Sequence, residues 1–300
     1  MKLLKKSLPV LFIILCLFAS LEESHAQNAN QIMVKVDSVE NFTYNSSVRK
    51  AQFTSCRYEI SGGKLKCNNS PRVVIVESVH KDYLVAPKKK NAKSLDMIIL
   101  PIADKGTNML VWKEADQDDN NFWLYLPALG KVKRIASTND GGETGSVFGT
   151  EFSIEDVSTR KIKDYTYKIL GEETLNNRPV WKVESVPTAQ RASKTFYSKA
   201  ISFVDKERFV ILKDELYDRN GKLFKQLITK KVDKINGFWI VTQSAMINLT
   251  ARRITNYDVL SADFDLQIDD EFLTQRAMTD FAYREKKMNE YRTSLKEVKK

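Results

Sequence analysis

Hydrophobic and polar residues alternate over much of this chain, a pattern that predicts β-strands. The C-terminal half should hold seven strands joined by short turns, near residues 165–171, 179–186, 196–204, 208–217, 222–234, 238–249 and 252–265. Two of the turns contain Asn-Gly, at Asn220-Gly221 and Asn236-Gly237, which is the strongest short signal for a hairpin. Because long antiparallel strands must curl or close to protect their edges, we expect a large curved sheet.

The N-terminal half has a less regular pattern. Further strands are expected at residues 72–77, 95–100 and 109–113 and within 121–136, and a short helix at residues 29–38. A second short helix is expected within residues 151–162, because Ser153 precedes Glu155 and Asp156 as at a helix N-terminus. The polar, glycine-rich segment 137–150 between them predicts a mobile loop.

The strand expected at residues 121–126 is apolar on both of its faces. Phe122, Leu124 and Leu126 would point one way, and Trp123 and Tyr125 the other. A strand with one solvated face should alternate apolar and polar residues instead. Both faces of this strand must therefore be covered, by a helix, a second sheet or a lipid.

The same region carries a family resemblance. The run Trp123-Leu-Tyr-Leu-Pro127, then Lys131-Val-Lys-Arg-Ile135 and Gly145-Ser-Val-Phe-Gly-Thr-Glu-Phe-Ser-Ile-Glu-Asp156, resembles the LolA-like outer membrane lipoprotein-sorting proteins of Gram-negative bacteria. The similarity covers roughly residues 29–278. It implies a mainly β (α+β) fold: an open antiparallel half-barrel whose few helices form a lid over an apolar concave cavity.

The resemblance also implies a function. It suggests a periplasmic carrier that sequesters acyl chains of lipoproteins or lipids for transfer toward the outer membrane, beside an inner-membrane exporter or an outer-membrane acceptor. The alternative is a non-transporting periplasmic binding or stress-sensing module on the same fold. Such a sensor normally has a second domain, whereas only a short basic tail follows here.

Five residues are candidates for ligand binding in such a cavity. Trp123 and Tyr125 are expected on a cavity-facing side of their strand, and Arg134 at the rim, where it could pair with a headgroup. Phe148 and Phe152 are expected to plug the cavity from a lid formed by residues 137–157. The alternatives are ordinary core packing for the aromatic residues, a loop anchored by two phenylalanines, and a charged strand face for Arg134.

The two ends of the chain differ from the rest. Residues 1–26 form the expected signal peptide, with Lys2, Lys5 and Lys6 before an apolar run and cleavage after Ala26, which indicates the periplasm. Residues 27–280 are expected to form one domain, followed by a basic charged tail, helical or disordered, over 281–300. Without the signal peptide, the chain has 45 basic and 36 acidic residues, a net charge of +9. Membrane headgroups and acidic proteins are the anionic partners in a periplasm, where nucleic acid is absent, and transient contact with a membrane surface is expected. The alternative is an ordinary solvated surface.

Two cysteines follow the signal peptide, Cys56 and Cys67. They flank Ile60-Ser-Gly-Gly63, a hairpin signal, and with Ser61-Gly62 as the turn they would lie directly opposite each other. An exported protein can keep a disulfide there. Two buried free thiols are the alternative.

The sequence offers little for catalysis. His80 is the single histidine after the signal peptide, so neither a histidine-rich metal site nor paired imidazoles are expected. Nothing resembles a nucleophile elbow, and the glycines of residues 137–145 lack the lysine placement of a phosphate-binding loop. We therefore expect a protein that is not an enzyme and needs no cofactor.

Overall fold

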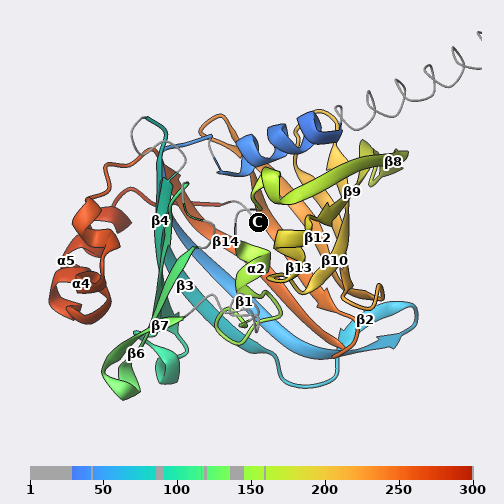
Figure 1. The fold of residues 1–300 in the computed structure, drawn as a ribbon. Helices are drawn as coiled ribbons and strands as arrows, with labels where there is room; N and C mark the ends of the chain where they lie inside the picture. The colour runs from blue at the N-terminus through green and yellow to red at the C-terminus, as the bar shows by residue number, and fades with distance from the viewer. Residues whose placement is uncertain are drawn as a thin grey trace, which may run out of the picture.

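A single curved antiparallel sheet dominates the computed structural model, which describes residues 29–41, 43–85, 91–115, 117, 120–135, 145–158 and 160–298 (Figure 1). The expected signal peptide and residues 137–144 of the expected loop lie outside the described residues. None of the described helices is both long and apolar enough to span a membrane.

The strands agree closely with the alternation of the sequence, and all seven expected in the C-terminal half are present. Their bounds are β1 (Ser46–Ser61), β2 (Lys64–Cys67), β3 (Arg72–Tyr83), β4 (Asn91–Leu100), β5 (Asn108–Lys113), β6 (Asn121–Leu126), β7 (Lys131–Ile135), β8 (Tyr165–Leu175), β9 (Arg178–Pro187), β10 (Tyr197–Asp205), β11 (Ile211–Asp218), β12 (Leu223–Ile235), β13 (Phe238–Asn248), β14 (Arg253–Phe264) and β15 (Lys296–Glu297).

Most neighbouring strands in the sheet are also consecutive in the sequence. The order is β7-β6-β5-β4-β3-β1-β14-β13-β12-β11-β10-β9-β8, with β2 paired to β1 and β15 paired to β14. β7 and β8 lie at the two ends of this order, so the sheet stays open, and its curvature leaves a concave side (Figure 1). This is the open half-barrel that the sequence predicted.

The turns use residues that tolerate a left-handed backbone. Asn236 and Gly237 both have positive φ, of 50° and 91°, which matches the twist of a tight hairpin. Gly62 and Gly63 do the same between β1 and β2, with φ of 60° and 74°. The expectation that Ser61-Gly62 forms this turn is therefore wrong by one residue.

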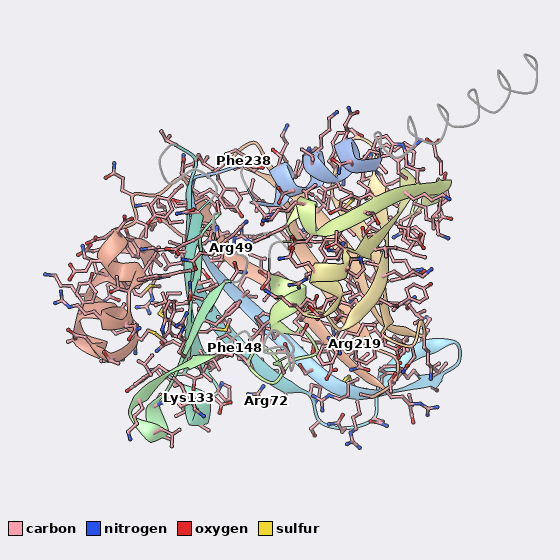
Figure 2. All side chains as sticks on the ribbon, viewed as in Figure 1. Arg49, Arg72, Lys133, Phe148, Arg219 and Phe238 are labelled. Atoms are coloured by element: carbon pink, nitrogen blue, oxygen red, sulfur yellow. A yellow bond between two sulfur atoms is a disulfide. The ribbon has the colours of Figure 1, made fainter. Side chains whose placement is uncertain are left out.

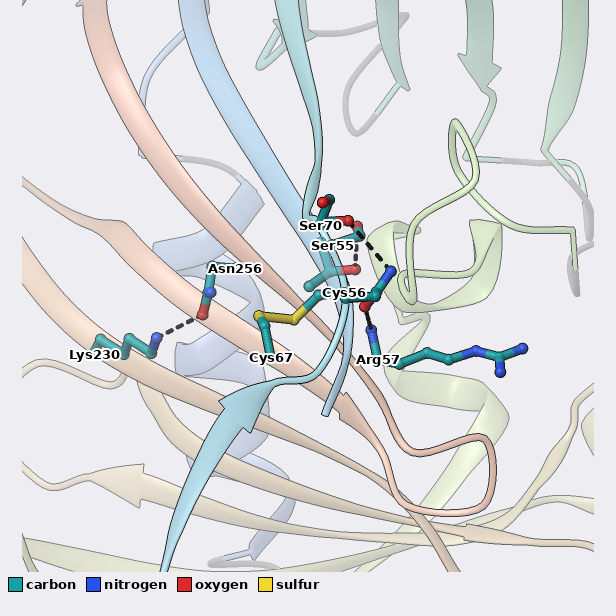
Figure 3. Close-up of a disulfide and its surroundings, with 9 residues drawn as sticks. Ser55, Cys56, Arg57, Cys67, Ser70, Lys230 and Asn256 are labelled. Atoms are coloured by element: carbon teal, nitrogen blue, oxygen red, sulfur yellow. Dashed lines mark hydrogen bonds between the residues drawn. A yellow bond between two sulfur atoms is a disulfide. The ribbon is translucent and has the colours of Figure 1, made fainter. Parts of the chain in front are cut away.

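The shifted turn changes how the two cysteines meet. Cys67 lies opposite Tyr58 in the register, so Cys56 reaches Cys67 diagonally. They form a disulfide with 5.7 Å between the Cα atoms, at the base of the β1–β2 hairpin (Figure 3). The predicted bridge is present, and the alternative of two free thiols is not.

Helices α4 (Gln275–Thr279) and α5 (Phe281–Arg292) cover the outer face of β4–β7 (Figure 1). Together with the preceding 3-10 helix η5 (Asp270–Leu273), they bury a cluster that includes Phe272, Met278 and Met288, all inaccessible to solvent. Residues 281–292, expected to begin a charged tail, are therefore helical and contribute to the hydrophobic core.

On the concave side, residues 29–41 are helical, as predicted. Their apolar side Ile32, Met33 and Val36 packs against Val183 and Val204 of β9 and β10. This places the helix over the part of the sheet opposite to that covered by α4 and α5 (Figure 1).

Candidate ligand cavity

The concave side of the sheet encloses a cavity of about 560 Å³, within the range of small-molecule binding sites. Inward-pointing residues of many strands line it, because every second residue of a strand faces the same side. Large apolar or aromatic side chains make up much of the wall: Phe53, Val76, Met109, Val111, Phe122, Leu216, Leu227, Met246 and Tyr257.

Residues 145–157, which we call the strap, run across the concave side and include the short helix α2 (Ile154–Val157). On one side, Val147 and Ile154 pack against Met109 and Phe122 of β5 and β6. On the other, Phe152 packs with Leu216 and Met246 of β11 and β13. The strap thus bridges two walls of the half-barrel that are far apart in the sheet.

Helix α2 begins with a capping box, which confirms the N-terminus predicted at Ser153. The backbone N–H of Asp156 donates to Ser153 Oγ, and the Ser153 N–H donates to the Asp156 carboxylate at 2.8 Å. Because this arrangement satisfies N–H groups that a helix start leaves free, so short a helix can persist here.

Buried ionic contacts hold α2 to β10, β12 and the segment before β10. The Asp156 carboxylate accepts from Tyr197 Oη at 2.6 Å and pairs with Lys225 Nζ at 2.9 Å. Glu155 pairs with Arg191 at 2.9 Å and accepts from the Phe196 N–H. Burial raises the pKa of Glu155, although the hydrogen bond from Thr195 and the charge of Arg191 act to lower it. Burial and the neighbouring charge of Asp156 raise the pKa of Tyr197.

The beginning of the strap is tied to the edge of the sheet. Arg72, the first residue of β3, donates through Nη1 to the Phe148 carbonyl at 2.7 Å and pairs through Nη2 with Asp104 at 2.7 Å. Glu151 pairs with Arg253, the first residue of β14, and its N–H donates to Thr255 Oγ1 at 2.9 Å. Both strands begin at the same edge of the sheet, so the strap closes the cavity near that edge.

Comparison with known proteins identifies the family. The sequence model of a family described as "Uncharacterized protein" matches residues 90–280, more than half of the chain. No curated protein matches it. A DUF1329 family protein from Desulfovibrio piger is similar in structure, with a TM-score of 0.73 and 25% identity over 85% of this chain and 99% of that one.

Two further solved structures share the fold. A putative outer membrane lipoprotein-sorting protein domain from Vibrio parahaemolyticus has a TM-score of 0.71, with 23% identity over 85% of this chain and 99% of that one. A LolA superfamily protein from Nitrosomonas europaea has a TM-score of 0.60, with 16% identity over 82% and 97% of the two chains. The chain belongs to the family whose model it matches, and it shares its fold with the LolA superfamily protein.

Two of the five predicted ligand-binding residues line the cavity. Phe152 is 7% exposed and forms ring contacts with Phe53 and Tyr257 at 6.0 and 6.5 Å between centroids. Phe148 also lines the cavity, and its φ of 51° is that of a tight turn. In Figure 2, Phe148 lies near Arg72, the residue that binds its carbonyl oxygen.

The other three predicted residues are not among the cavity-lining residues. Trp123 and Tyr125 pack on the outer face in the cluster beneath α4 and α5, where Trp123 contacts Trp112 at 5.0 Å between rings. Arg134 is exposed, lies opposite Trp123 in the register and donates to Asn121. The apolar side of β6 that meets the cavity is instead that of Phe122 and Leu124. Both faces of the strand are covered, as predicted, but the aromatic face is covered by helices.

The cavity also has a charged end that sequence reasoning missed. Arg160 pairs with Asp214 at 3.3 Å, and Asp214 also accepts from Ser202 at 2.8 Å. Burial raises the pKa of Asp214, although the charge of Arg160 acts to lower it, and Glu40 of the N-terminal helix lines the same end of the cavity. In the sequence, Asp214 is a charged residue at a buried position of β11 that the alternation would otherwise assign to an apolar side chain. That exception is the local feature that could have indicated a charged end of the cavity.

The described residues contain a single imidazole and no grouped metal ligands. His80 lines the cavity with its imidazole 2.8 Å from Asp82, and no second imidazole lies among the described residues. In those residues, no group of three or more His, Cys, Asp or Glu side chains is placed to hold a metal ion.

Proposed function

We propose that the protein is a periplasmic carrier that holds acyl chains of lipids or lipoproteins in its cavity and moves them toward the outer membrane. The observation that carries this proposal is the cavity itself, about 560 Å³ on the concave side of the sheet, with apolar or aromatic side chains at about half of its lining positions. Each buried CH₂ group contributes about 0.8 kcal/mol, so one long chain can be bound tightly without a specific polar contact.

Three further features support the proposal. The strap lies across the cavity, where a bound chain would contact Phe148 and Phe152. The charged end around Arg160 and Glu40 offers polar partners for a headgroup, while the apolar wall takes the chain. A protein of similar structure is described as a putative outer membrane lipoprotein-sorting domain. The expected signal peptide would deliver the chain to the compartment where such cargo moves.

Native mass spectrometry of protein purified from a bacterial periplasm, followed by lipid extraction, tests the proposal. We expect a stoichiometric acylated ligand. Val111→Trp, which places an indole in the cavity, should displace it. Leu170→Trp, which adds the same ring at an exposed position of β8, should leave it bound.

An empty protein that also ignores added lipids and acylated peptides would contradict the carrier. That result would favour the second candidate, a periplasmic binding or stress-sensing module that recognises a protein. Retention of the ligand in both tryptophan variants would place the binding site outside the cavity.

A further inference from the structure

Exposed apolar side chains are concentrated at one edge of the sheet. We call it the strap edge, because Arg72 and Arg253 bind the strap there. Strands β4 and β6 end at this edge, and strands β5 and β7 begin at it. In the described part of the chain, thirteen large apolar residues are exposed, and eight of them lie at this edge: Ile60, Leu65, Val73, Leu100, Ile102, Leu129, Val186 and Phe196.

Two neighbouring turns form the first apolar projection of this edge. Ile102, in the β4–β5 turn, is 81% exposed, and Leu129, in the β6–β7 turn, is 63% exposed. The turns are in contact, since a Cβ on Gly106 would lie only 3.2 Å from Pro127 Cγ. The two turns that carry these aliphatic side chains are therefore neighbours at the edge.

The β1–β2 hairpin forms the second projection. Beyond Arg57, β1 pairs only with β2, so the hairpin extends past the neighbouring strands. Ile60 and Leu65 lie opposite each other near its tip and are 72% and 42% exposed. The Cys56–Cys67 disulfide closes the base of the hairpin and limits its movement (Figure 3).

Basic residues surround both projections. Lys105, Lys131 and Lys133 are exposed around the first, where Asp104 is already paired with Arg72. Lys64 and Lys66 are exposed on the second, beside Glu59. Figure 2 shows Arg72, Lys133 and Arg219 toward this edge, with Phe238 at the opposite one. The strap edge thus combines protruding aliphatic side chains with an excess of positive charge.

We propose that the strap edge docks on the surface of an anionic lipid bilayer. Apolar side chains that enter the headgroup layer, flanked by lysine and arginine, are the usual means of peripheral membrane binding. A stable protein partner would instead need a continuous packed patch of about 1,000 Å² or more, whereas these side chains stand on separate, narrow turns. The proposal rests on the carrier function, because it names the surface where cargo would be exchanged.

Arg72 connects the docking surface to the cavity. Its guanidinium binds Asp104, in the same turn as Ile102, and also the Phe148 carbonyl of the strap. A bilayer that contacts the first projection therefore lies next to the segment that closes the cavity.

Co-sedimentation of the exported, cargo-free protein with lipid vesicles tests the proposal. We expect binding to vesicles of phosphatidylethanolamine and phosphatidylglycerol, little binding to phosphatidylcholine alone, and weaker binding at high salt. The double variant Ile102→Glu/Leu129→Glu should lower the partition onto anionic vesicles about tenfold, because it replaces inserting side chains with anions.

The matched control is Val85→Glu/Leu170→Glu, which adds the same charges at exposed apolar positions: Val85 follows the end of β3 opposite the strap edge, and Leu170 lies within β8. It should bind vesicles like the unaltered protein. Equal loss in both double variants, or no vesicle binding by the unaltered protein, overturns the proposal. Binding only to an acidic protein would also overturn it and would assign the edge to a protein partner. Because vesicle binding is measured without cargo, failure here is distinguishable from an empty cavity in the mass spectrometry experiment.

Discussion

Asp156 shows how much one residue can do in this fold. It caps α2 together with Ser153, and it also accepts from Tyr197 and pairs with Lys225. The side chains of Lys225 and Asp156 are 7% and 2% exposed, so neither charge is solvated. A buried pair of this kind contributes little net stability, but removing one partner leaves the other charge buried and unpaired.

Lys225→Met should therefore destabilise the protein by about 3–5 kcal/mol, since it leaves the buried Asp156 carboxylate without its cationic partner. Chemical denaturation measures this change. The matched control is Lys206→Met, whose partner Glu172 is 61% exposed, and it should cost less than about 1 kcal/mol. A similar small effect of both substitutions would mean that Asp156 does not depend on Lys225.

At the scale of the element, the β1–β2 hairpin depends on its disulfide more than on packing. Every residue of β2 is exposed, so the bridge and the ladder to β1 are what hold the strand. The strap differs, because it is fixed by buried contacts at both ends rather than hanging free. These contacts favour a segment 151–157 that stays in place across the cavity over one that moves freely as a lid.

Cys56→Ala/Cys67→Ala should lower the free energy of unfolding by up to about 3 kcal/mol, the chain-entropy value for so short a loop. Hydrogen exchange should accelerate at the amides of Ile60 and Leu65, while amides of β12 and β13 change little. Unchanged exchange in the hairpin would show that the β1–β2 ladder is sufficient alone.

At the scale of the whole molecule, the C-terminal helices complete the core. Met288 is fully buried and Tyr291 is 8% exposed in the cluster on the outer face. Arg292 reaches back to β3, where its Nη2 pairs with the buried Glu77 at 2.7 Å. The helix α5 therefore closes one side of the sheet, although its sequence reads as a charged tail.

A chain that ends at Asp280 should lose cooperative unfolding or aggregate, because the outer face of β4–β7 becomes exposed. Met288→Ala removes a single side chain from the same packing and should lower the free energy of unfolding by about 2–5 kcal/mol, measured by chemical denaturation. Lys286→Ala, at an exposed position of the same helix, should change stability by less than about 0.5 kcal/mol. Normal stability of the shortened chain would show that α5 is dispensable.

The sequence by itself determined the local structure. Strand positions follow from alternation, the hairpins from Asn-Gly and Gly-Gly, and the start of α2 from Ser153 and Asp156, because each depends on neighbours close in the chain. The predicted β1–β2 turn was displaced by one residue, because Ser61-Gly62 and Gly62-Gly63 can both form a tight turn.

Which faces meet depends on contacts between residues far apart in the chain. Alternation shows that Phe122 and Trp123 lie on opposite sides of β6, but it does not say which side faces the cavity, and Trp123 lies beneath the helices instead. The contacts of Asp156 with Lys225 and of Arg160 with Asp214 join residues far apart in the sequence, so no local pattern could reveal them. The curvature of the sheet brings these residues together and thereby forms the cavity, its charged end and the strap edge.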